Sequence, residues 1–106
     1  MVGIRLRGTA TAKDTDAISE QEWVKLRQYL GLSQLQTEIV RRLLLGKSRQ
    51  EIAHELAIGS RTVRTHTDRV CHEFGVSNRV HLVLHVLAAV RDLWEREEHS
   101  LYTWER

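Results

Sequence analysis

Five polar side chains within residues 61–72 recur at the spacing of one helical face, and their types suit contacts with nucleic-acid bases. They are Arg61, Arg64, Thr65, Asp68 and His72. Positions i, i+3, i+4, i+7 and i+11 lie on one side of an α-helix. Arginine can donate two hydrogen bonds to guanine, and a carboxylate can accept one from the amino group of cytosine. A polar helix face can also be an ordinary solvated surface, so the neighbouring elements must decide between the two interpretations.

The other face of this segment is apolar, which predicts a helix that packs on a core. Val63 and Phe74 lie on that side, and Gly75 can end the helix in the left-handed conformation. Ile58 and Val63 have the spacing of a hydrophobic staple, which puts Gly59 at the N-cap position. We therefore expect a helix from residue 60 to about residue 74.

A short helix precedes this one, after a turn of about three residues. Ser48 and Glu51 form a capping box, and Ile52 and Leu56 supply an apolar face. Two helices joined in this way form a helix-turn-helix, whose second helix offers its exposed face to the major groove of DNA. Near the start of the short helix, the side chains that could bind phosphates with help from the helix dipole are Lys47, Arg49 and Gln50.

Serine residues at N-cap positions predict three more helices. Ser19 caps a helix over residues 20–30, Ser33 caps one that ends before Gly46, and Ser77 caps the last one. The last helix begins with residues 80–90, which are apolar at nine of eleven positions, and continues into an acidic tail with aromatic residues. Together with the absence of proline, these patterns predict an all-α fold.

The chain resembles the LuxR-type (FixJ/NarL/GerE) helix-turn-helix over about residues 32–90, without a gap. The residues that carry the resemblance are Leu32-Ser33, Glu38-Ile39-Val40, Gly46, Glu51-Ile52-Ala53, Leu56, Ile58, Thr62-Val63-Arg64, His66, Gly75-Val76 and Arg79. The resemblance implies a four-helix DNA-binding domain of bacterial transcription regulators. We therefore expect a LuxR-type four-helix core with an extra N-terminal helix and an extended C-terminal helix.

The resemblance also implies roles for single residues. In the family, the positions of Arg64, Thr65 and Asp68 reach base edges, and those of Thr62 and His66 support or touch the phosphate backbone. The full set of base-edge candidates is Arg61, Arg64, Thr65 and Asp68. The full set of phosphate candidates is Lys47, Arg49, Gln50, Thr62, His66 and Arg69.

Three departures from the family pattern bear on affinity and specificity. Leu35 and Gln36 stand where an Arg-Glu pair is usual, and Arg42 stands where an apolar residue is common. Asp68 and Glu73 occupy positions that are often basic, and an acidic group is repelled by phosphate unless it accepts from cytosine. These acids keep a second hypothesis open, in which the fold binds another regulator or a sigma factor and binds DNA weakly or not at all.

The last helix allows two interpretations, because it is apolar nearly all round. It could be buried completely within one chain, or one side could contact a second copy, as the resemblance implies for this helix. The candidates for a two-fold dimer contact are Leu82, His85, Val86 and Ala89. All three Trp and both Tyr lie in the first helix or the tail, and we expect these aromatic residues to pack together, within a chain or across a dimer.

These patterns predict four segments. They are a flexible arm or short strand (1–17), an accessory N-terminal helix (18–31), the LuxR-type domain (32–90) and a helical acidic and aromatic tail (91–106). Relatives usually join such a domain to a receiver or ligand-binding domain. Only 31 residues precede the domain here, so we expect a stand-alone regulator.

Composition excludes several classes of function. The net charge is only +2, but residues 47–79 hold six basic against four acidic residues, the sign that phosphate binding needs. The single cysteine, Cys71, cannot form an intramolecular disulfide, which favours the cytoplasm.

His81 and His85 lie one helical turn apart, but a structural zinc site usually needs four ligands, so we expect no metal and no cofactor. No catalytic motif, signal peptide or membrane span is recognisable. The expected partners are double-stranded DNA and a second copy of the chain, with a protein partner as the alternative.

Overall fold

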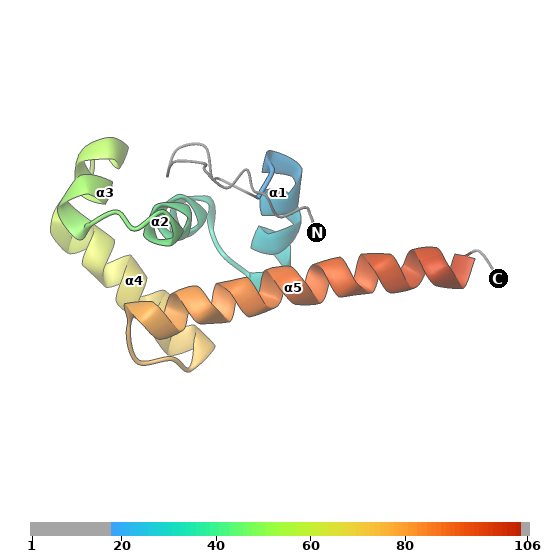
Figure 1. Cartoon of the computed structure of the whole chain (residues 1–106). Helices are drawn as coiled ribbons and strands as arrows, with labels where there is room; N and C mark the ends of the chain where they lie inside the picture. Colours follow the sequence, from blue (N-terminus) through green and yellow to red (C-terminus); the bar gives the residue numbers. More distant parts are fainter. Residues whose placement is uncertain (1–17, 105–106) are drawn as a thin grey trace.

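The computed structural model describes residues 18–104, with side chains through residue 96, and these residues form five helices joined by short turns (Figure 1). The helices are α1 (Glu20–Leu30), α2 (Gln34–Leu44), α3 (Arg49–Leu56), α4 (Ser60–Phe74) and α5 (Arg79–Trp104). No strand occurs in the described residues, and the predicted all-α fold, with its extra first helix and its long last helix, is confirmed. The arm or strand expected for residues 1–17 lies outside the described residues.

Capping side chains explain where the helices begin. Ser19 Oγ accepts from the N–H of Glu22 at 3.1 Å, while the Glu22 carboxylate accepts from the N–H of Ser19 at 2.9 Å. The same reciprocal pair begins α2 and α3, as the sequence predicts. α5 differs from the prediction, because Asn78 rather than Ser77 caps it. The N–H of His81 donates to Asn78 Oδ1 at 2.9 Å.

One hydrophobic core joins the five helices, and each helix contributes a side chain that is at most 1% exposed. These side chains are Leu26, Ile39, Ile52, Val63 and Leu82, in the order of the helices. α2 lies at the centre, since it contacts each of the other four helices. The core therefore holds α3 and α4 at a fixed angle, and α4 can present its polar face outward without losing its apolar contacts.

The dimer contact predicted on α5 is wrong for Leu82, Val86 and Ala89. These side chains are at most 7% exposed and belong to the core of the single chain, so they have no surface left for a second copy. The ring of His85 stacks on Phe74 of the same chain, with 4.4 Å between the ring centroids. This side of α5 therefore closes the core over α2 and α4.

The other side of α5 is apolar and exposed. Its large exposed side chains are Val80, Leu84, Leu87 and Trp94. Figure 1 shows that α5 continues past α1, the last helix beside it, toward the C-terminus. α5 is thus a core helix on one face, while on the other face Val80, Leu84 and Leu87 form an apolar surface that none of the described helices covers.

Aromatic residues join α1 to the rest of the molecule. Trp23 is buried, and the guanidinium of Arg41 lies over its ring at 5.3 Å. Tyr29 donates from its hydroxyl to Asp92 Oδ2 at 2.5 Å, and Trp94 in α5 donates from Nε1 to a carboxylate of α1 at 3.0 Å. α1 therefore anchors the middle of α5. The predicted packing of aromatic residues also involves Tyr102 and Trp104, whose side chains lie outside the described residues.

Candidate nucleic-acid interface

α3, a connection of three residues and α4 form the predicted helix-turn-helix. Ala57 takes the left-handed conformation (φ 57°), and the N–H of Ile58 returns to the carbonyl of Ala53 at 3.0 Å. Gly59 is the N-cap of α4, with no capping side chain. α3 and α4 then pack through Ile52 and Val63, which are both almost completely buried. The short connection and this packing set the direction in which α4 faces solvent.

The structure brings all four base-edge candidates to one exposed region of α4. Arg61, Arg64, Thr65 and Asp68 are exposed, while Val63 on the other side of the helix is buried. Arg64 and Asp68 form an ion pair across one turn, with 3.8 Å between Nε and Oδ2. Their side chains are 67% and 71% exposed, so solvent screens the pair and both groups can exchange it for an outside partner.

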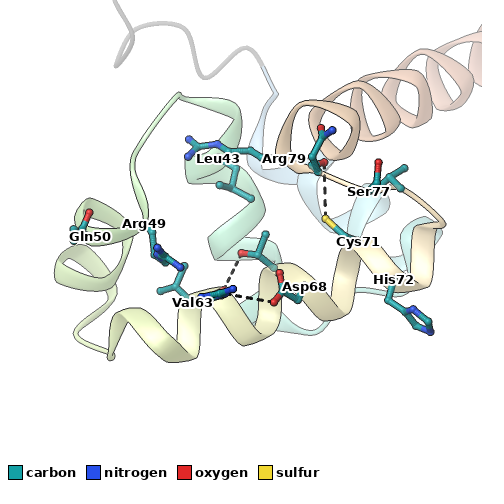
Figure 2. Close-up of a pocket in the computed structure, with 13 residues that line it drawn as sticks. Leu43, Arg49, Gln50, Val63, Asp68, Cys71, His72, Ser77 and Arg79 are labelled. Atoms are coloured by element: carbon teal, nitrogen blue, oxygen red, sulfur yellow. Dashed lines mark hydrogen bonds and ion pairs between the residues drawn. The ribbon is translucent and has the colours of Figure 1, made fainter.

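An open groove of about 800 Å³ runs beside this face of α4 (Figure 2). The start of α3 contributes Arg49 and Gln50 to one wall, and α4 contributes polar side chains to the floor. The turn between α4 and α5 supplies the other wall, with Ser77, Asn78 and Arg79. The groove therefore joins the start of α3 to α4 and to the turn that follows α4.

The sequence pattern does not identify this second wall. Ser77 was expected only as a cap, and Arg79 only as one of the residues that carry the family resemblance. That resemblance is the one signal that could have pointed to Arg79. The guanidinium of Arg79 donates from Nη2 to the backbone carbonyl of Lys47, which ties the second wall to the segment before α3.

The phosphate candidates do not form a single set. Arg49 and Gln50 line the groove and are exposed, and Thr62 and Arg69 are exposed on α4. His66 is half-buried instead, and its Nδ1 is buried with no hydrogen-bond partner among the described residues.

Lys47 is also separate from the groove, because its ammonium group is bound within the chain. Lys47 Nζ lies 2.6 Å from Glu55 Oε2, and Arg42 Nε donates to Glu55 Oε1 at 2.8 Å. Arg42 Nη1 also donates to Glu38 Oε1 at 2.7 Å. These groups line a different hollow, of about 420 Å³, between α2, α3 and the start of α1.

This charge cluster shifts the ionisation of two of its members. The hydrogen bond from Lys47, and then the one from Arg42, hold the pKa of Glu55 below its ordinary value. Burial opposes the charge of Arg42, but the hydrogen bonds to Glu38 and Glu55 outweigh it and raise the pKa of Arg42. Arg42, which departs from the family pattern, therefore serves as a charged link between α2 and α3.

Cys71 lies in the groove, between α4 and the α4–α5 turn (Figure 2). Its thiol is buried, with Sγ 4.0 Å from the carbonyl oxygen of Asn78. Burial, followed by the negative charge of Asp68, raises the pKa of the thiol. Burial and a raised pKa both favour a packing role for Cys71 over that of a reactive thiol.

The described part of the chain holds neither a metal-binding cluster nor a membrane-spanning helix. No group of three or more His, Cys, Asp or Glu side chains there could hold a metal ion. The two histidines that lie one helical turn apart have other contacts. His85 stacks on Phe74, and His81 Nδ1 lies 3.5 Å from Ser77 Oγ. None of the described helices combines the length and the apolar content that crossing a bilayer requires.

Comparison with known families gives one match. The family model described as bacterial regulatory proteins, luxR family, matches residues 30–86, which is more than half of the 106 residues. The matched region covers α2, α3, α4 and the start of α5. Comparisons with curated proteins and with solved structures give no match.

Proposed function

We propose, from the premise that this chain belongs to the LuxR family of bacterial regulatory proteins, that it is a sequence-specific regulator of transcription whose helix α4 reads the major groove of DNA. At the level of the family, the chain is a DNA-binding transcription regulator and not an enzyme. The observation that carries the finer proposal is the exposed polar region of α4, which lies beside a groove with basic side chains on both walls.

The exposed side chains of α4 have the chemistry to distinguish bases. Arg64 can donate two hydrogen bonds to guanine, Thr65 can contact the methyl group of thymine, and Asp68 can accept from the amino group of cytosine. Arg61, nearer the start of α4, is a further donor. Because each of these side chains is exposed and none is fixed by the core, they are free to meet base edges when α4 enters the groove.

Phosphate contacts would hold α4 in register. Arg49 and Gln50 lie at the start of α3, where the helix dipole favours an anion, and Arg69 is exposed on α4. Thr62 and His66 are further candidates for phosphate contacts. Thr62 is exposed, whereas His66 is half-buried and so less accessible to a phosphate. Such contacts supply affinity but no sequence preference.

We also propose that the protein binds DNA as a homodimer through the exposed side of α5. Val80, Leu84, Leu87 and Trp94 follow one another at intervals of four, three and seven residues, which is the repeat of a coiled-coil seam. A two-fold pair would present two copies of α4 to two half-sites about one helical turn of DNA apart. Because its target is bacterial DNA, we place the protein in the cytoplasm.

The experiment that tests this function is a titration of the protein against a random pool of labelled duplex DNA, followed by fluorescence anisotropy over a range of salt. We expect binding whose logarithm falls linearly with the logarithm of salt, by about 0.9 for each phosphate contacted. Selection from the same pool should then enrich one sequence. Absence of binding at low salt would contradict the proposal.

That negative result would favour the second candidate function, a module that binds another regulator or a sigma factor. The observation in its favour is that Asp68 and Glu73 are both exposed on α4, where they lower the positive charge of this helix. The next experiment would then be a search for a protein partner, with the whole protein as bait.

A further inference from the structure

Lys47 lies next to the start of α3, yet its charge is directed into the chain. Its backbone is fixed on both sides, since its N–H donates to the carbonyl of Arg42 at 3.0 Å and its carbonyl accepts from Arg79. Its side chain is bound to Glu55, and the two side chains are 35% and 34% exposed. Lys47 therefore holds a fixed place beside the predicted phosphate site at α3, while its ammonium group faces a carboxylate.

We propose that Glu55 limits the affinity of the protein for DNA by holding Lys47 away from the phosphate backbone. This inference rests on the proposed DNA-binding function and adds to it a residue that sets affinity without touching DNA. Glu55 acts as a positioning residue, because it acts through the side chain of Lys47.

The geometry supports an exchange of partners. The lysine side chain has a flexible stem, so Nζ can move while the backbone stays in place. The pair with Glu55 is a partly exposed ion pair, and such pairs are weak enough to open. A phosphate that captured Lys47 would have to replace an existing carboxylate contact, so the net gain in binding is small while Glu55 carries its charge.

Removing the charge of Glu55 should therefore have two effects, and both strengthen DNA binding. Lys47 becomes available as one more cation for DNA, and one negative charge near the phosphates disappears. The frame of the cluster stays in place, because Arg42 keeps its bonds to the carboxylate and the backbone carbonyl of Glu38. A purely structural role for Glu55 predicts the opposite, since loosening α3 would weaken DNA binding.

The test compares the wild-type protein with Glu55→Gln, Lys47→Gln and the double variant, each titrated with the random duplex pool over a range of salt. We expect Glu55→Gln to steepen the salt dependence by about 0.9 and to bind up to about tenfold more tightly at 0.1 M salt. Lys47→Gln alone should change little. In the Glu55→Gln background it should remove the whole gain, and this dependence identifies Lys47 as the source.

Glu95→Gln is the matched control, because it removes the same charge from an exposed ion pair with Arg91 on α5. It should leave the salt dependence unchanged, which separates the effect from a general change in net charge. Glu55→Ala provides a second way to remove the charge, and circular dichroism confirms that each variant is folded.

Two results would overturn the inference while leaving the DNA-binding function intact. One is wild-type binding with an unchanged or lower affinity in Glu55→Gln. The other is a salt dependence reduced by about 0.9 in Lys47→Gln alone, which would mean that Lys47 already contacts phosphate. If neither the wild-type protein nor any variant binds DNA at low salt, the proposed function itself is wrong, and this inference fails with it.

Discussion

Arg79, in the first turn of α5, donates a hydrogen bond from Nη2 to the backbone carbonyl of Lys47, the residue just before the N-cap of α3. The two residues are 32 positions apart in the sequence. The bond connects the helix proposed for dimerisation to the helix proposed for phosphate binding. It therefore fixes the two walls of the groove relative to each other.

We predict that Arg79→Met lowers the free energy of unfolding by about 1 to 3 kcal/mol, because a half-buried carbonyl loses a charged donor. Urea denaturation followed by circular dichroism measures the change. Arg61→Met is the control, since Arg61 is exposed on α4, away from the proposed seam, and its replacement should cost no more than about 0.5 kcal/mol. Equal losses in the two variants would show that the bond to Lys47 adds no stability.

Replacement of Arg64 by alanine should change base preference without changing stability. Arg64 is exposed and supports no core contact, but a bidentate contact with guanine discriminates against other bases by about 1 to 3 kcal/mol. We expect Arg64→Ala to lose selection at one base pair of the enriched sequence, with an unchanged unfolding midpoint. Selection from the random pool in parallel with wild type checks this. If both proteins enrich the same sequence with the same strength, Arg64 does not read a base.

The two sides of α5 should respond differently to the same substitution. Leu82 is completely buried, so Leu82→Ala should cost about 2 to 5 kcal/mol of stability. Leu84 is 57% exposed in the single chain, so Leu84→Ala should leave the monomer stable and weaken the dimer instead. Sedimentation equilibrium and urea denaturation of both variants give the two quantities. A monomeric wild-type protein, or a Leu84→Ala dimer as tight as wild type, would contradict the proposed seam.

The turn between α3 and α4 contains a position at which a substitution should raise the stability of the fold. Ala57 has φ 57°, a left-handed conformation that costs a residue with a Cβ about 1 to 2 kcal/mol. Ala57→Gly should therefore raise the free energy of unfolding by about 0.5 to 1 kcal/mol, after the entropy that glycine loses on folding. The reverse change at a comparable position, Gly75→Ala (φ 71°), should be destabilising. Thermal unfolding of the two variants should give shifts of opposite sign.

The cluster around Glu55 predicts a dependence of stability on pH. Its pKa is lower in the folded chain than in the unfolded chain, because Lys47 and then Arg42 hydrogen-bond to the carboxylate. The pair therefore stabilises the fold above the ordinary glutamate pKa of about 4.3, and its contribution disappears as pH falls through the lowered pKa. The stability advantage of wild type over Glu55→Gln should shrink along an acid titration followed by urea denaturation. An advantage that does not change with pH would show that the charge of Glu55 is not its source.

Local signals in the sequence predict most of the fold because they act over a few residues. The capping boxes at Ser19, Ser33 and Ser48 place the starts of three helices correctly. The choice between Ser77 and Asn78 as the cap of α5 could not be made in this way, since both are good caps one residue apart. The structure distinguishes them, since Asn78 Oδ1 accepts from the N–H of His81.

The sequence also does not predict which side of α5 faces the core. Because nearly every position from residue 80 to residue 90 is apolar, periodicity does not say which side faces the core. The side chosen for the dimer contact, with Leu82 and Val86, is the side that α2 and α4 bury. Only the placement of the other helices distinguishes it from the side with Leu84.

Some features of the candidate site can be predicted from the sequence, and others cannot. The exposed face of α4 follows from helical spacing alone, so the structure brings Arg61, Arg64 and Asp68 together as expected. The contact between Lys47 and Glu55 depends instead on how α2, α3 and their connection pack. Long charged side chains can reach several partners, and spacing along the sequence does not select among them.

The length of α5 also determines how the molecule rotates in solution. Its 26 residues span roughly 39 Å at 1.5 Å per residue, and the molecule measures 51 × 32 × 22 Å. Rotation about the long axis is therefore faster than end-over-end rotation. The N–H bonds of a helix point along its axis, so those of α5 relax mainly through the slower motion. Nuclear relaxation along α5 can thus report whether a second chain lies parallel to it, which would thicken the particle, or continues it end to end, which would lengthen it.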